Sequence, residues 1–214
     1  MKTITSCVEQ LVKHQPFVED ALLRKIINYS ALAEDFQPHI EKELGKKINV
    51  GSIVMALRRY FPQKRLDPKM VRELGDIVVR SGITDFTFLN SNTILDSQSN
   101  LLERVKGIPK AYFTYSSTFH ESNILVSNDL TEVVEKCFEK EICVTIKKDL
   151  SSLSIALPVD NSKTVGLYFY IFKLLAYEGI PIFEVISTSN YFTLFLEKEY
   201  VNQAFALVNE IKNG

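Results

Sequence analysis

Metal-binding and disulfide-forming residues are scarce in this chain. Its 214 residues include three cysteines, three histidines and no tryptophan. The cysteines are odd in number and show no CxxC spacing, and the histidines form no HExxH pattern, so neither a disulfide framework nor a zinc site is indicated. These six residues are Cys7, Cys137, Cys143, His14, His39 and His120. We therefore expect neither a metal nor a cofactor.

Long apolar runs and catalytic motifs are also missing. No stretch is long and apolar enough to span a bilayer, and the opening MKTITSCVEQLVKHQ is too polar for the apolar region of a secretory signal. We expect a cytoplasmic protein that has no membrane partner. The chain has no Gly-rich phosphate loop with lysine, no GxSxG motif and no obvious acid/base pair. It is therefore not expected to be an enzyme, and a link to catalysis would require a separate catalytic partner.

The apolar residues of the C-terminal third follow a regular pattern. Between residues 153 and 211, runs of β-branched and aromatic residues alternate with segments that repeat apolar residues every 3.6 positions. The resulting order is strand, helix, strand, strand, helix, with Gly179 and Pro181 ending the first helix and Ser189-Asn190 forming a hairpin break. We expect an antiparallel sheet with both helices on one face. The last helix carries an apolar stripe of Val201, Ala204, Phe205, Val208 and Ile211.

Specific segments within this stretch resemble a known family. Gly166 opens the first helix, LLAYEGIPIFEVISTS follows, and a short turn leads to FTLFLEKEY and a helix containing QAFALVNEI. In this combination residues 151–214 resemble the second ACT regulatory module at the end of aspartate kinases. The sequence departs from the family at Thr164-Val165, where the family often has proline before the glycine, and it contains no kinase domain.

Residues 75–148 repeat the same order of elements. DIVVRS, GITDFTFLNS, AYFTYSST, ESNILVSND and EICVTIKK are strand candidates, while SNLLERVKG and LTEVVEKCFEK are helix candidates. Two βαββαβ patterns in tandem indicate internal duplication. Because the C-terminal pattern supplies only three strands, we infer that residues 76–80 complete its sheet, as in the aspartate kinase regulatory region. The loop NTILD before the first helix lacks glycine, which makes a second equivalent ligand site less favoured.

The first 75 residues are predicted to be helical. The segments are VEDALLRKIIN with Pro16 as its start, YSALAEDF with Ser30 as its cap, PHIEKELG with Pro38 in its first turn, and NVGSIVMALRRYF with Asn49 as its cap. Gly45 ends the third helix. Short helices joined by tight turns are typical of helix-turn-helix domains, and residues 28–60 resemble the winged-helix type.

Basic residues are concentrated in residues 46–72, where eight Lys or Arg oppose a single acid, Asp67. Such a patch is the usual footprint of an anionic partner, and the fourth helix has a polar face able to reach phosphates or base edges. The alternatives are a face that docks on the acidic half of the same chain and a solvated surface that binds nothing. The apolar stripe of this helix is Val50, Ile53, Val54, Leu57 and Phe61. The candidate DNA-binding residues are Lys46, Lys47, Ser52, Met55, Arg58, Arg59, Lys64 and Arg65.

A second candidate site precedes the first helix of the C-terminal third. A ligand carboxylate is favoured at a helix start, where Gly166 allows close approach, and Asp160 is suited to pair with an ammonium group. The resemblance implies an amino-acid effector held between this loop and a strand of the partner module. The alternative is that these residues only form a turn and cap a helix. The candidate ligand-binding residues are Asp160, Asn161, Ser162, Thr164, Val165, Gly166, Pro181 and Ile182.

The sequence thus predicts an α+β protein in three parts. Residues 1–75 form a helical, winged-helix-like domain, and residues 76–150 and 151–214 form two ferredoxin-like, ACT-like βαββαβ modules. The predicted function is that of an amino-acid-responsive transcriptional regulator. The alternative is a stand-alone regulatory or interaction subunit of an amino-acid biosynthetic enzyme. The expected partners are an amino-acid effector, duplex DNA and a second copy of the chain in a homodimer.

Overall fold

The computed structural model describes residues 2–61, 72–109 and 111–213. The chain divides into two compact units, residues 1–65 and residues 66–214. Across the described ranges, no helix is long and apolar enough to cross a membrane. The same ranges contain no group of three His, Cys, Asp or Glu side chains placed to hold a metal ion.

The N-terminal unit is built from helices that share one apolar core. They are α1 (Ile4–Lys13), α2 (Pro16–Leu23), α3 (Tyr29–Leu44) and α4 (Val50–Arg59). All four contribute buried side chains to this core, among them Val12, Leu22, Phe36, Ile40, Ile53 and Leu57. Residues 2–61 contain no strand, so the β-hairpin wing of a winged-helix domain is not found in that range.

The boundaries of the N-terminal helices differ from the prediction in two places. Pro38 lies inside α3 and does not start a new helix. Proline removes only one helical hydrogen bond, and the helix continues because Phe36 and Ile40 on either side are both buried in the same core. Asn28 is the cap of α3, because its side-chain oxygen accepts from the backbone N–H groups of Ser30 and Ala31 at 3.0 and 3.2 Å.

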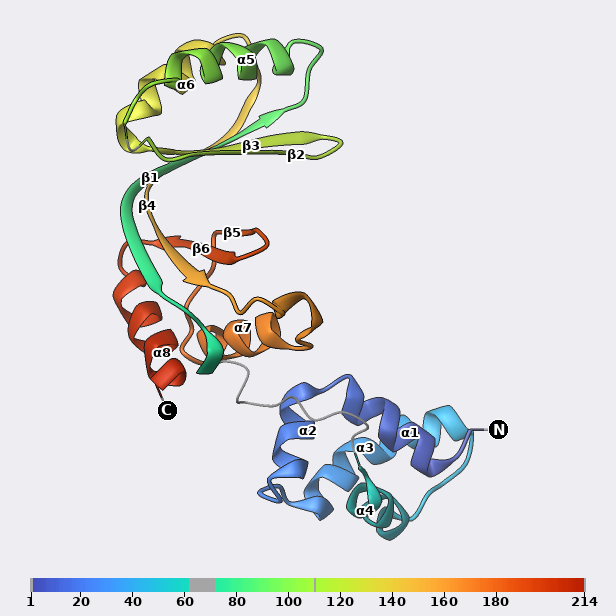
Figure 1. Ribbon diagram of the computed structural model, residues 1–214. Helices are drawn as coiled ribbons and strands as arrows, with labels where there is room; N and C mark the ends of the chain where they lie inside the picture. The colour runs from blue at the N-terminus through green and yellow to red at the C-terminus, as the bar shows by residue number, and fades with distance from the viewer. Residues whose placement is uncertain (1, 62–71, 110, 214) are drawn as a thin grey trace. The chain divides into compact units, whose positions relative to one another are not determined.

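The C-terminal unit is an α+β fold, as predicted, with a six-stranded antiparallel sheet in the order β2-β3-β1-β4-β6-β5 (Figure 1). The strands are β1 (Ile77–Leu89), β2 (Phe113–Ser117), β3 (Glu121–Ser127), β4 (Cys143–Ala156), β5 (Glu184–Ser187) and β6 (Tyr191–Glu197). The helices are α5 (Ile94–Val105), α6 (Thr131–Cys137), α7 (Leu167–Tyr177) and α8 (Val201–Asn213).

Two strands are longer than predicted and join the two halves of the sheet. DIVVRS and GITDFTFLNS form the single strand β1, and EICVTIKK and LSIALPV largely form the single strand β4. These strands pair along most of their length, from Ile77 opposite Ile155 to Phe88 opposite Cys143. The expected pairing of residues 77–79 with the C-terminal segment is therefore present. The first part of each long strand lies beside the second part of the other.

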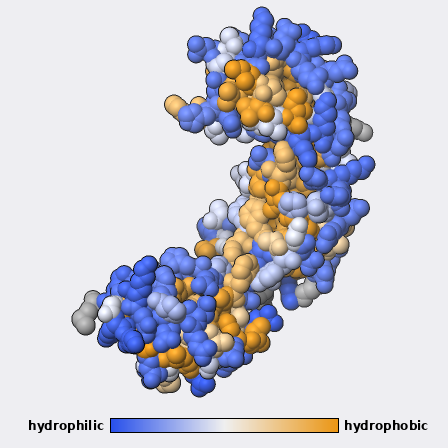
Figure 2. Space-filling model, turned by 180° about the vertical axis from the view of Figure 1, so that it is seen from behind, coloured by the Kyte–Doolittle hydropathy of each residue, from blue (hydrophilic) through white to orange (hydrophobic). Residues whose placement is uncertain are grey.

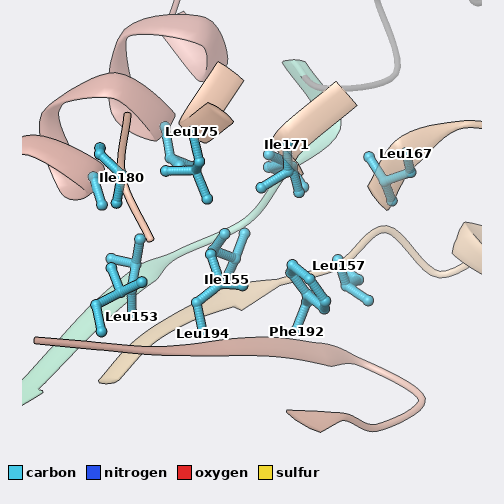
Figure 3. Packing of buried hydrophobic residues seen from close by; sticks show 13 residues of the cluster. Leu153, Ile155, Leu157, Leu167, Ile171, Leu175, Ile180, Phe192 and Leu194 are labelled. Atoms are coloured by element: carbon cyan, nitrogen blue, oxygen red, sulfur yellow. The ribbon is translucent and has the colours of Figure 1, made fainter. Parts of the chain in front are cut away.

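Each half of the sheet has its own helix layer and core. The helices α5 and α6 pack with Phe86, Phe88 and Ile124, while α7 and α8 pack with a second cluster on β4 and β6. Figure 3 shows this second cluster, in which Leu167, Ile171 and Leu175 of α7 lie over the side chains of the strands. The helix α5 begins at Ile94, so part of the predicted loop NTILD is helical, and Ile94 is buried in the core.

A third cluster lies on the opposite face of the sheet. Side chains alternate between faces along a strand, so Ile83 of β1 points away from the helices that Phe86 and Phe88 contact. Ile83 is fully buried with Leu125, Leu150 and Phe195, which come from both halves of the sheet. In each half of the sheet one face packs against helices. The opposite faces of the two halves therefore meet around these four side chains.

Candidate functional site

The loop of residues 157–166, between β4 and α7, contains most of the predicted ligand-binding residues. Gly166 has a φ of 89° and stands immediately before α7, in a backbone conformation that other residues rarely adopt. No side chain caps this helix start. The backbone carbonyl of Gly166 accepts the first helical hydrogen bond from Tyr170 at 2.9 Å. The helix dipole and the backbone N–H groups of the first turn, which have no partner within the helix, make this end of α7 favourable for a carboxylate.

The loop is fixed against the turn between β5 and β6. Asn161 donates through Nδ2 to the backbone oxygens of Pro158 and Ser189, both at 2.8 Å. The backbone N–H of Leu157 donates to the backbone oxygen of Asn190 at 2.8 Å. The bonds to Ser189 and Asn190 connect segments that are far apart in the sequence. The amide of Asn161 thus has a structural role, consistent with the turn-forming alternative.

The first turn of α7 also contacts this hairpin. The hydroxyl groups of Tyr168 and Ser187 lie 2.9 Å apart, within hydrogen-bond distance. The sequence pattern did not assign these two residues to the site. The only available signal was the Ser-Thr-Ser end of the predicted strand, and nothing in the sequence shows which loop that end meets.

The remaining polar residues of the loop are accessible to solvent. The Asp160 carboxylate pairs with the Lys163 ammonium group at 3.3 Å, and the two side chains are 78% and 83% exposed. Thr164 donates through its hydroxyl to the Asp160 backbone oxygen at 3.2 Å, so it stabilises the turn. Ser162 and Val165 are exposed. An exposed carboxylate and an uncapped helix start therefore flank the same short loop.

The structure does not bring Pro181 and Ile182 to this loop within one chain. They follow α7, whereas the loop precedes it, and an 11-residue helix is about 16 Å long. Ile182 packs against the core between α7 and the sheet. A role for these two residues in ligand binding stays a prediction.

The N-terminal unit presents the predicted basic residues on its surface. Arg59 is exposed and Met55 is 49% exposed, while the guanidinium group of Arg58 lies 5.7 Å from the centre of the Tyr29 ring. Phe61 is 82% exposed and does not continue the apolar stripe of α4. Lys46, Lys47 and Ser52 are also exposed. Lys64 and Arg65 lie outside the described residues.

The connection between α3 and α4 is well defined. Gly45 ends α3 with a φ of 66°, and the backbone N–H of Ile48 donates to the Glu41 carboxylate at 2.7 Å. Gln37 donates through its side-chain amide to the Ile48 backbone oxygen at 2.7 Å. These bonds hold α4 in a fixed position relative to α3, so its exposed residues form a defined surface.

No protein-family profile and no curated protein sequence matches the chain. Solved structures do match. The regulatory subunit of aspartate kinase from Thermus thermophilus aligns with a TM-score of 0.54 at 13% identity, covering 64% of this chain and 98% of that chain. The corresponding subunit from Thermus flavus gives 0.52 at 13% identity, covering 64% and 97%. Aspartate kinase from Clostridium acetobutylicum gives 0.54 at 14% identity, covering 65% of this chain and 35% of the enzyme.

These likenesses concern the fold. The matched share of the chain exceeds the length of the N-terminal unit, so it includes much of residues 66–214. At such low identity, similar folds can carry different functions. The chain therefore contains the fold of aspartate kinase regulatory domains.

Proposed function

We propose that this chain is a regulatory protein that binds an amino-acid effector through its C-terminal unit and has no catalytic activity of its own. The observation that carries the proposal is the start of α7. A left-handed glycine opens a helix without a side-chain cap, and the exposed carboxylate of Asp160 lies on the same short loop. The match to regulatory subunits of aspartate kinase supports the proposal.

The proposed binding mode uses both ends of an amino acid. The effector carboxylate accepts hydrogen bonds from the backbone N–H groups at the start of α7, where the helix dipole also favours negative charge. The ammonium group pairs with Asp160 and displaces Lys163, which is held only by an exposed ion pair of low stability. Ser162 and Val165 then face the effector side chain and contribute to selectivity.

We further propose that residues 76–150 and 151–214 are two ACT-like modules, and that the first part of β1, which pairs with residues 152–155, completes the sheet of the second module. The helix α7 is preceded by glycine in the left-handed conformation, whereas Thr93 precedes α5. We therefore assign the effector to the C-terminal module.

A thermal-shift screen against the twenty common amino acids tests the effector site. One amino acid at a hundred times its Kd should stabilise the protein by about 2.7 kcal/mol, which is a rise in Tm of roughly 5–10 °C. Gly166→Ala should abolish this rise, because alanine strains the left-handed backbone that precedes α7. Gly179→Ala is the matched control, since Gly179 is also left-handed, with a φ of 66°, but ends α7.

Asp160→Asn should weaken binding of the same amino acid by about tenfold, because a charged hydrogen bond to the ammonium group is lost. Glu178→Gln, at the other end of α7, should leave the affinity unchanged. If no amino acid stabilises the protein, or if both glycine variants respond equally, the start of α7 is not the effector site.

For the N-terminal unit we propose that the basic surface of α4 binds duplex DNA, with two copies of the chain spanning two half-sites. The exposed Arg59 and the exposed lysines before α4 support an anionic partner. The alternative is docking on a biosynthetic enzyme. A binding assay on duplex DNA across a salt series distinguishes these functions, because phosphate contacts give an affinity that falls steeply with salt. Absence of salt-dependent DNA binding would leave the enzyme subunit as the supported function.

A further inference from the structure

The two halves of the sheet touch through the faces that carry no helix. Phe195 of β6 and Ile186 of β5, which belong to the second half, pack with Ile83 and Leu125 of the first half. The ring of Phe195 also lies 6.2 Å from that of Tyr112, measured between the ring centres. Figure 2 shows the C-terminal unit as an upper and a middle lobe with a hollow between them on one side. The contact therefore covers only part of the two faces.

A buried carboxyl group lies in this contact. Asp85 stands directly opposite Leu125 in the pairing of β1 with β3, so the two side chains lie on the same face of the sheet. Only 1% of Asp85 is exposed, although no helix covers this face. Its carboxylate accepts a hydrogen bond from the side-chain amide of Asn123 at 2.6 Å. Because Leu125 is buried against residues of the second half, the same contact encloses Asp85.

A second carboxyl group lies on the facing surface. Glu184 stands opposite Phe195 in the pairing of β5 with β6, so it shares the face that meets the first half. Burial raises the pKa of Asp85, the hydrogen bond from Asn123 opposes that rise, and the negative charge of Glu184 adds to it. When both carboxyl groups are ionised they repel each other across the contact, and exclusion of water strengthens the repulsion.

The other charged or titratable side chains around Asp85 are Lys147 and Cys143 on β4, Glu197 on β6, Arg80 on β1, and Tyr112 beside Arg80. Lys147 is opposite Asp85, but its ammonium group pairs with Glu197 at 2.7 Å. Burial raises the pKa of the Cys143 thiol and of the Tyr112 hydroxyl above their ordinary values of 9.0 and 10.0. The pKa of Asp85, at about 6, lies in the neutral range.

We propose that the contact between the two halves of the sheet is a proton-controlled switch, closed when Asp85 is protonated and opened when Asp85 and Glu184 are both charged. The two long strands already bend where the halves join, since Gly82 of β1 and Asp149 of β4 have φ values of 76° and 58°. A change of angle at these two positions separates the facing surfaces while each half keeps its own helices and core. This switch does not rest on the proposed function.

The direction of the switch follows from proton linkage. Asp85 returns to water when the halves separate, so the closed form binds the proton more tightly than the open form. Protonation therefore favours the closed form, and this preference is lost as the pH rises through 6. With a pKa of about 6 in the closed form and 3.8 in the open form, the ratio of open to closed molecules should rise about tenfold between pH 5 and pH 8.

Relaxation-dispersion nuclear magnetic resonance of the full chain, with labelled Ile and Leu methyl groups, measures the open population directly, because it detects exchange on the microsecond to millisecond scale. Ile186 and Leu125 report from opposite sides of the contact. Leu101 of α5 belongs to the separate core of the first half and should not respond. We expect the open population seen by Ile186 and Leu125 to rise about tenfold from pH 5 to pH 8. An open population that is equal at these two pH values overturns the proposal.

Substitutions then assign the switch to its carboxyl groups. Asp85→Asn keeps an acceptor for Asn123 and should hold the contact closed at every pH. Glu184→Gln changes a half-buried side chain and should reduce the rise, because the facing charge is lost. Glu121→Gln is the matched control, since Glu121 is an exposed carboxyl group at the far end of the same face, opposite Leu89. A tenfold rise that persists in Asp85→Asn or in Glu184→Gln, or that disappears in Glu121→Gln, refutes the assignment.

Discussion

Asp85 is a buried carboxyl group whose ionisation should control stability. It lies on the face of β1 that carries no helix, with 1% of its surface exposed, and Oδ1 accepts from Nδ2 of Asn123 at 2.6 Å. Its cross-strand neighbour Lys147 pairs with Glu197 at 2.7 Å. Burial raises the pKa of Asp85 from 3.8 to about 6; the hydrogen bond from Asn123 opposes this, and the negative charge of Glu184 adds to it.

The sign of the pH effect follows from the direction of this shift. The folded state binds the proton more tightly than the unfolded state, so protonation of Asp85 stabilises the fold. The contribution is fully present below pH 3.8 and is lost as the pH rises through 6. A shift of about two pKa units corresponds to about 3 kcal/mol. Between pH 8 and pH 5 the free energy of unfolding should rise by roughly 1.4 kcal/mol from this group alone.

Asp85→Asn keeps the shape and the acceptor for Asn123 and removes the charge. The variant should therefore be more stable than the natural chain at pH 8, by up to about 3 kcal/mol, and the difference should shrink as the pH falls to 5. Urea unfolding followed by circular dichroism at pH 5, 6, 7 and 8 measures both quantities. Asp129→Asn, at an exposed carboxyl group, is the control and should follow the natural chain.

The comparison between these two variants isolates Asp85 from other groups that titrate in the same range. A stability difference between Asp85→Asn and the natural chain that stays constant from pH 5 to pH 8 would refute the reasoning. So would a variant that is less stable than the natural chain at pH 8, because the carboxylate would then have a favourable partner.

Three further predictions concern packing. Gly75→Ala should destabilise the C-terminal unit by about 1–3 kcal/mol in urea unfolding, because the added Cβ would lie 2.9 Å from the Ala156 side chain. Phe195→Ala should cost about 3–5 kcal/mol and expose amides of β1 and β4 to hydrogen exchange, because Phe195 is buried where the halves of the sheet meet; unchanged exchange would contradict this. Ile40→Ala should cost the N-terminal unit about 2–5 kcal/mol and leave exchange of the sheet amides unaltered, since Ile40 belongs to a separate core.

The order of elements could be predicted from the sequence because it depends on local periodicity and on glycine. The helix α8 buries Val201, Ala204 and Val208 from its predicted stripe. Gly179 follows α7 in the left-handed conformation expected of a helix stop. In the N-terminal unit, α4 begins after its predicted cap, Asn49. These features need only neighbouring residues, so one sequence is sufficient to indicate them.

The continuity of the long strands was not predictable in the same way. Gly82, with a φ of 76°, and Asp149, with a φ of 58°, look like turn positions in the sequence. In the sheet they lie within β1 and β4, because pairing on both sides keeps the chain extended through the local irregularity. Similarly, Pro38 looks like a helix start but lies inside α3, because a shared core outweighs one missing hydrogen bond.

The residues discussed as sites also fall into two groups, those set by local sequence and those set by contacts between distant segments. The sequence by itself predicted a turn at Asp160 and a helix start at Gly166, because these are local features; their role in binding stays a prediction. Only the tertiary structure placed Ser189 beside Asn161 and Asp85 inside the sheet. Those contacts join residues far apart in the chain, and they form only when the sheet brings its strands into register.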